Sequence, residues 1–295
     1  MLFRSQVVRM VFLSLVAVAS GEVSLQVQGQ NAAPGSAASD GASGDNFTRA
    51  TRQTQSIEIP AVNYFARGSE TTIEFAATDL APGTGGQARV KMLKDGGVSV
   101  TARFAGLGTP AKFGNQYLTY ILWAAVPKGR TIKIGEVMVD GNGGQVVATT
   151  ALHTFAMLVT VEPYAAVTQP SSVAILKSTV PEAGATPSAS AQVELLRDAY
   201  APPGYSYEPL DASSGYAPEI VQAINARRVA KAMQAEKYAG ERFRNAEGLY
   251  QAMMNTAIQG KKPSKQVLQM AKVAADTYEE ARAVSSRQLA MRQKP

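Results

Sequence analysis

Polar and apolar residues alternate in several short segments between residues 53 and 177. This period-two pattern is typical of strands with one buried face. Clear examples are residues 56–59, 72–75, 88–93 and 98–104. The last two flank Asp95-Gly96-Gly97, which predicts a β-hairpin with a glycine-rich turn. About seven or eight strands of this kind, with turn residues at about every tenth position, predict an all-β immunoglobulin-like sandwich over residues 53–177.

A nearly continuous apolar run, YLTYILWAAV, covers Tyr117 to Val126 and predicts a buried central strand. It contains Trp123, the only tryptophan of the chain. A tryptophan inside an apolar strand indicates the centre of the core rather than a platform for a ligand. The remaining strands are expected at residues 131–139, 145–150, 154–161 and 173–176, the last of them at an edge of the sheet.

Residues 178–216 are rich in Pro, Ala, Ser and Tyr and are predicted to form a linker. Within it, residues 192–199 are expected to form one or two helical turns. The Tyr/Pro-rich part, from Tyr200 to Pro209, has two interpretations. It could dock as an extended peptide into a partner's aromatic groove, or it could lie on the surface of the sandwich. We favour the second interpretation.

Residues 217–293 show helical periodicity and predict an antiparallel α-helical hairpin of two helices, about 65 and 45 Å long. Small and aromatic residues recur at spacings of three and four, as in a coiled coil. The two seams are Ala239, Phe243, Ala246, Tyr250, Met253 and Ala257, and then Val267, Ala271, Ala274, Tyr278, Ala281 and Ser285. The segment Gly260–Ser264 separates the helices. The apolar N-terminal half of the first helix must pack on the sandwich or on another chain.

The pattern at the N-terminus predicts an export signal. Arg4 and Arg9 precede the apolar run 10–19, which ends in Ala17-Val18-Ala19. This layout predicts a cleaved signal peptide over residues 1–19. The alternative is an uncleaved membrane anchor, which is less favoured because a membrane-spanning helix would need about 20 apolar residues. Residues 20–52 contain few large apolar side chains and are expected to form a disordered leader. No later segment is expected to span a membrane, so we expect a protein of the periplasm or outer envelope.

The composition agrees with export to a bacterial periplasm. Cysteine is absent, which excludes disulfides, thiolate metal sites, cysteine nucleophiles and a lipid-modified cysteine. The formal net charge is +6. The positive excess lies in the C-terminal segment, because residues 216–295 contain 14 Lys and Arg against 7 Asp and Glu.

Candidate catalytic chemistry is sparse. His153 is the only histidine, and we interpret it as structural. Neither a metal-ligand spacing nor a nucleotide-binding or nucleophile-elbow motif is present, so we expect no enzyme activity, no metal and no cofactor.

The basic residues of the hairpin suggest an anionic partner instead. The candidates for binding it are Arg227, Arg228, Lys231, Lys261, Lys262 and Lys265. In an exported protein this partner would be acidic lipid, lipopolysaccharide phosphate or a wall polymer, and not nucleic acid. The alternative is an ordinary solvated helix surface with Glu partners one turn away.

Several motifs carry a family resemblance. Tyr120, Trp123, Gly129, the Ile134-Gly135-Glu136 triplet, Gly143-Gly144, Phe155 and Val159 to Pro163 share the layout of one kind of sandwich. The segment resembles the extracytoplasmic sandwich of anti-sigma-K-type factors. The resemblance is closer to acidobacterial-type envelope proteins, in which such a sandwich precedes an alanine-rich helical hairpin of unknown function.

In many of these relatives a peptidoglycan-binding domain of the outer membrane protein A type follows the hairpin. That domain has no counterpart here before Pro295. The resemblance implies an exported, non-enzymatic structural or interaction protein of the cell envelope. Its partner would be an envelope protein or an anionic envelope polymer, and the hairpin could mediate self-association. The alternative function is a binding module for peptidoglycan or another anionic polymer.

Overall fold

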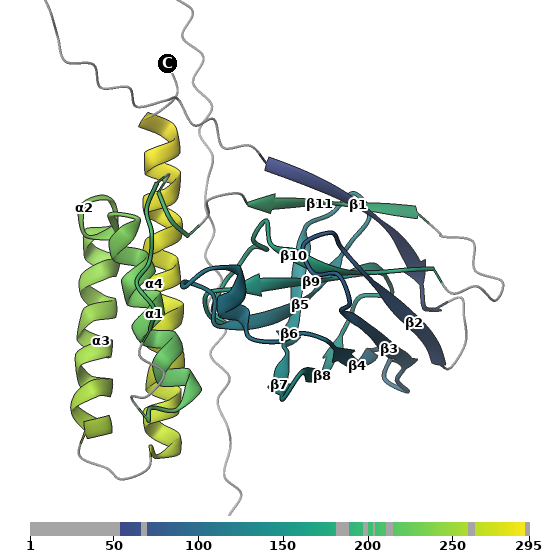
Figure 1. Ribbon diagram of the computed structural model, residues 1–295, viewed down its shortest axis with the longest axis horizontal. Coiled ribbons are helices and arrows are strands. Elements are labelled where there is room, and N and C mark those ends of the chain that lie inside the picture. Colours follow the sequence, from purple (N-terminus) through teal and green to yellow (C-terminus); the bar gives the residue numbers. More distant parts are fainter. Residues whose placement is uncertain are drawn as a thin grey trace, which may run out of the picture. The chain divides into compact units, whose positions relative to one another are not determined.

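The computed structural model describes residues 54–65, 70–180, 189–196, 200–202, 204–210, 215–258 and 263–292. All of these residues belong to the unit Thr48–Pro295. The expected signal peptide (1–19) and leader (20–52) lie outside the described residues. Mostly antiparallel β-structure is followed by C-terminal helices, as the sequence predicts (Figure 1).

The strands have the following bounds: β1 Thr54–Asn63, β2 Glu70–Ala77, β3 Gly85–Met92, β4 Val98–Ala105, β5 Thr119–Ala125, β6 Thr131–Glu136, β7 Met138–Asp140, β8 Gly143–Thr150, β9 Thr154–Glu162, β10 Ala174–Ser178 and β11 Ala189–Leu196. In β2 and β4 exposed and buried residues alternate, so one face of these strands meets solvent. All of β5 and nearly all of β9 are buried, which places them at the centre of the core.

Strand β9 organises the sheet because it pairs with three others. It pairs with β5 along most of its length, with β10 on its other side, and with the end of β1. Trp123 of β5 is fully buried, and its indole N–H donates a 2.7 Å hydrogen bond to the Thr160 hydroxyl of β9. The prediction of Trp123 as a core residue is therefore confirmed.

The strand expected at residues 131–139 changes partners in its middle. Its first part, β6, pairs with β5, and its last part, β7, pairs with β8. Between them, the Val137 N–H still bonds to the Tyr120 carbonyl at 2.9 Å. Gly135 lets β6 approach β8, since a Cβ there would lie 2.9 Å from a methyl of Val146. The strands of residues 54–196 form a near-barrel, sandwich-like structure, hereafter the sandwich (Figure 1).

Two expectations about the end of the sheet are wrong. The strand expected at an edge, β10, lies between β9 and β2. Residues 192–199 were expected to form one or two helical turns, but residues 192–196 belong to strand β11, which pairs with β1. Residues 197–199 lie outside the described residues. Two features favour a strand in this segment. Every second residue, Ala191, Val193 and Leu195, is fully buried, and pairing with β11 covers an edge that β1 would otherwise leave open.

The Tyr/Pro-rich segment lies on the protein itself. Tyr200 and Tyr207 are buried, and the Tyr207 hydroxyl donates a hydrogen bond to the Tyr200 carbonyl. For these two residues, the interpretation that the segment covers the protein's own surface is confirmed.

The helices are α1 Pro218–Ala232, α2 Ala235–Tyr238, α3 Gly240–Ile258 and α4 Lys265–Arg292. The expected uninterrupted first helix is therefore wrong. It breaks at Gln234, whose φ of 57° and ψ of 34° are left-handed. The break folds the chain so that both α1 and α3 pack against α4 (Figure 1). No described helix has the length and apolar character needed to cross a membrane.

The residues predicted on the two seams meet inside this helical part. Phe243 of α3 and Tyr278 of α4 are buried, with ring centroids 5.6 Å apart. The alanines of the second seam, Ala271, Ala274 and Ala281, are fully buried. Most seam residues are thus buried within the chain, while Tyr250 and Ala257 of the first seam are half-buried.

We predict that Gln234→Gly raises the free energy of unfolding by about 0.5–1 kcal/mol, because glycine adopts left-handed angles without the Cβ clash. The matched control is Gln251→Gly, at an exposed position inside α3, which should cost about 1 kcal/mol. Urea unfolding followed by circular dichroism measures both. If Gln234→Gly and Gln251→Gly lowered the free energy of unfolding equally, residue 234 would not have a left-handed backbone conformation.

Candidate functional site

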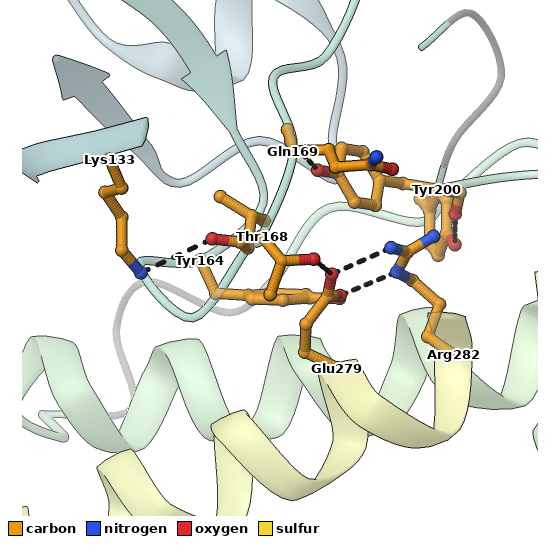
Figure 2. A network of polar contacts seen from close by, with 9 residues as sticks. Lys133, Tyr164, Thr168, Gln169, Tyr200, Glu279 and Arg282 are labelled. Carbon is orange, nitrogen blue, oxygen red and sulfur yellow. Dashed lines mark hydrogen bonds and ion pairs between the residues drawn. The ribbon is translucent and has the colours of Figure 1, made fainter. Parts of the chain in front are cut away.

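The helices join the sandwich through a buried ion pair on α4. The Nε of Arg282 lies 2.6 Å from Oε2 of Glu279, and their side chains are only 3% and 1% exposed. A second bond joins Nη2 of Arg282 to Oε1 of Glu279 at 2.7 Å. The pairing is bidentate, which is the strongest geometry for these two groups (Figure 2).

Side chains from the sandwich complete this pair. The Tyr164 hydroxyl donates a 2.8 Å bond to Glu279, and the Thr168 hydroxyl donates a 3.2 Å bond. Both residues come from the loop after β9. The guanidinium of Arg282 lies over the ring of Tyr200, with its Cζ atom 4.9 Å from the ring centroid. Figure 2 shows these groups converging on α4.

The environment keeps Arg282 charged. Burial alone would lower the pKa of its guanidinium, but the charge and hydrogen bonds of Glu279 raise that pKa above its ordinary value. Burial of two charges costs several kcal/mol for each ion unless partners and hydrogen bonds compensate. Both carboxylate oxygens of Glu279 and the guanidinium of Arg282 have partners. These contacts offset the desolvation cost of the buried pair.

A second buried carboxylate, Glu162, ends β9. Its Oε1 accepts hydrogen bonds from the Thr160 hydroxyl and, at 2.8 Å, from the Ser171 N–H. Thr160 in turn accepts the bond from Trp123, so the core is linked to this carboxyl group. Burial raises the pKa of Glu162 to about 8, and the bonds from Ser171 and Thr160 offset only part of that rise. With its pKa raised this far, the Glu162 carboxyl group favours the protonated form at neutral pH.

Helix α1 contacts the sandwich through amide and guanidinium groups. Asn225 donates 2.7 Å bonds to the carbonyls of Gln116 and Pro163. Gln222 donates a 2.6 Å bond to Glu136 at the end of β6. This helix corresponds to the N-terminal half of the expected long helix. That half was expected to pack either on the sandwich or on another chain, and α1 packs on the sandwich.

Four of the six basic residues predicted to bind an anion are among the described residues, and three of them have partners within the protein. Arg227 pairs with Glu247 at 2.6 Å, and Lys231 with Glu236 at 3.4 Å. Lys265 is exposed at the start of α4. Lys261 and Lys262 lie outside the described residues.

Arg228 serves a structural contact instead. Its guanidinium donates to the backbone carbonyls of Asn115 and Glu208, at 2.8 and 2.6 Å. It also lies over the ring of Tyr207, 4.8 Å from the centroid. Arg228 thus holds the Tyr/Pro-rich segment and the sandwich against α1.

A cleft of about 830 Å³ lies beside the Glu279–Arg282 pair. Its walls come from β1, β11, the turn between β5 and β6, the loop after β9, and α4. The described residues that line it are Ser56, Gly129, Arg130, Thr131, Thr168, Gln169, Pro170, Gln192, Glu194, Leu196, Arg282, Ala283, Ser286 and Arg287. Sequence reasoning missed this cleft, because its lining residues come from five separate segments and form no motif.

The contact of His153 agrees with the structural role expected for it. Its Nε2 lies 2.7 Å from the Gly96 carbonyl oxygen in the β3–β4 turn. Within the described part of the chain, no three His, Asp or Glu residues gather as metal ligands would.

Comparison with protein-family models, with curated proteins and with solved structures found no significant match. The resemblance to acidobacterial-type envelope proteins therefore stays a prediction from the quoted motifs.

We predict that Glu279→Ala and Arg282→Ala each lower the free energy of unfolding by about 3–5 kcal/mol, because each leaves the other charge buried and unpaired. The double variant should cost less than the sum of the two. The neighbouring exposed Glu280→Ala is the control and should change stability by less than about 0.5 kcal/mol. Urea unfolding of all four variants gives the coupling energy. Additive losses would show that the two side chains do not act as a pair.

We predict that stability falls as pH rises from 5 to 8, and that Glu162→Gln removes much of this fall. The pKa of Glu162 rises from its ordinary 4.5 to about 8 on folding, so the protonated form favours the folded state. This contribution is complete below pH 4.5 and is lost as pH rises through about 8. The loss is on the order of 2–4 kcal/mol.

The measurement is the free energy of unfolding in urea at pH 5 and pH 8 for wild type, Glu162→Gln and the control Glu58→Gln, which alters an exposed carboxyl group of β1. An equal pH dependence in wild type and Glu162→Gln would contradict the prediction.

Proposed function

We propose that this protein is an exported, non-enzymatic component of a bacterial cell envelope that acts by binding a partner. The sequence supports export through the N-terminal signal pattern. One structural observation carries the binding role. The buried Glu279–Arg282 pair, with Tyr164 and Thr168, fastens α4 to the loop after β9, so that the sandwich and helices form one fixed frame around an open cleft.

We also propose that the β-structure is an immunoglobulin-like sandwich and that α3 and α4 form an antiparallel hairpin. Two contacts support the hairpin: Arg292, at the end of α4, lies over Tyr238, just before α3, while Tyr278 contacts Tyr250 further along α3. Contacts in this opposite order are typical of antiparallel helices.

An envelope protein is the first candidate partner. A fixed frame favours this choice, because two rigid surfaces can be complementary without the entropy cost of ordering a hinge. Self-association would have to use a surface other than the seams of α3 and α4, because most seam residues are already buried within the chain.

An anionic envelope polymer such as peptidoglycan is the alternative partner. The structure narrows the residues that would bind it, because Arg227 and Lys231 already have acidic partners and Arg228 holds backbone carbonyls. The exposed Lys265, with Lys261 and Lys262 close to it in sequence, remains the stronger candidate set.

We predict that the protein is recovered with the cell envelope on fractionation of its native cells. If a polymer is the partner, a salt wash should release it, since exposed charge pairs are screened by salt. The triple variant Lys261→Glu, Lys262→Glu, Lys265→Glu should then lose envelope association. The matched control, Arg89→Glu, Lys91→Glu and Arg103→Glu on the outer face of β3 and β4, makes the same charge change elsewhere and should retain it.

Retention in both triple variants, with resistance to salt, would favour a protein partner and direct the search to cross-linking. Recovery in the cytosol would overturn the proposed location.

A further inference from the structure

We propose that the cleft beside α4 is a binding site for a carboxylate or phosphate group carried on a hydroxyl-rich ligand, such as a segment of an acidic glycan. The inference deepens the proposed binding role, but it rests on residues other than Lys261, Lys262 and Lys265.

Two guanidinium groups in the cleft are available to a ligand. Arg130, in the turn between β5 and β6, and Arg287, on α4, are both exposed. Neither makes an ion pair or hydrogen bond with another described residue. A guanidinium presents parallel N–H donors that match the oxygens of a carboxylate or a phosphate, so these two side chains favour an anion.

The other charged residues of the lining do not cancel the positive charge of Arg130 and Arg287. Arg282 also lines the cleft, but Glu279 balances its charge. Glu194 of β11 is the only acidic residue among the described lining residues. Two unbalanced guanidinium groups therefore stand against one carboxylate, which gives the cleft a net positive charge.

The remaining polar side chains suit a hydroxyl-bearing ligand. Ser56, Thr131, Gln169 and Gln192 supply hydroxyl and amide groups, which both donate and accept hydrogen bonds. No aromatic side chain is among the described lining residues, so recognition would depend on hydrogen bonds and charge rather than on stacking. The volume of about 830 Å³ falls within the range of roughly 300–1,000 Å³ that is typical of small-molecule sites.

The wall formed by α4 is held in place before any ligand arrives. Arg282 is nearly fully buried and bonded twice to Glu279, which also holds Thr168 of the opposite loop. A site whose walls are fixed loses little conformational entropy on binding. The same ion pair that joins α4 to the sandwich thus also shapes the cleft.

Calorimetric titration of the full chain tests the proposal with three probes: trigalacturonate, which carries carboxylates; glucose 6-phosphate, which carries a phosphate; and maltotriose, which is neutral. We expect binding of at least one of the two anionic probes and no measurable binding of maltotriose. Which of the two binds identifies the anion as a carboxylate or a phosphate. Failure of both to bind, or equal binding of maltotriose, would overturn the proposal.

The variant Arg130→Ala/Arg287→Ala should weaken binding at least tenfold. The matched control Arg89→Ala/Arg103→Ala removes two exposed arginines from the outer face of β3 and β4 and should change the Kd less than twofold. In the opposite direction, Glu194→Gln removes the repelling carboxylate and should tighten binding two- to fivefold. Equal weakening in both double variants would show non-specific attraction and contradict a site in the cleft.

The two proposals can fail separately. A protein found with the envelope whose probe binding is unaffected by Arg130→Ala/Arg287→Ala would refute the cleft and leave the proposed function standing. A cytosolic protein whose probe binding depends on Arg130 and Arg287 would support the cleft and refute the proposed envelope function.

Discussion

The structure depends on one buried ion pair. Glu279 and Arg282 lie almost completely out of water, and a buried pair of charges persists only where hydrogen bonds and partners surround it. The sandwich supplies them through Tyr164, Thr168 and Tyr200. This requirement fixes α4 against the loop after β9. Helices α1 and α3 then pack on α4, and one wall of the cleft is determined by the same contact.

Much of the β-structure could be predicted from the sequence, because period-two alternation and turn residues are local signals. The apolar runs of β5 and β9, with Trp123 at the centre, have the same local character. The break at Gln234 could not be predicted, since neither Gly nor Pro marks it. The break reverses the chain between two helices, α1 and α3, that both pack on α4. Strand β11 carried an alternating pattern, but its position in a segment rich in Ser, Ala and Pro hid it.

The site was less predictable than the fold. Charge counting directed attention to the helices, but Arg227, Arg228 and Lys231 proved to be bound within the protein. Arg130 and Arg287 gave no signal, because they are far apart in the sequence and only the tertiary fold brings them to one cleft. Glu162 could not be distinguished from an exposed strand-end carboxylate until its burial was known.

The hydrogen bond between Tyr164 and Glu279 joins residues 115 positions apart, and β1 pairs with β11 from the opposite end of the sheet's sequence. A fold with many contacts of such high sequence separation forms slowly, since large loops must close before the contacts repay their entropy. The chain emerging from a ribosome therefore cannot complete its core until nearly all of α4 has been synthesised. The proposed export would require late folding of this kind, because an exported chain passes through a translocation channel while still extended.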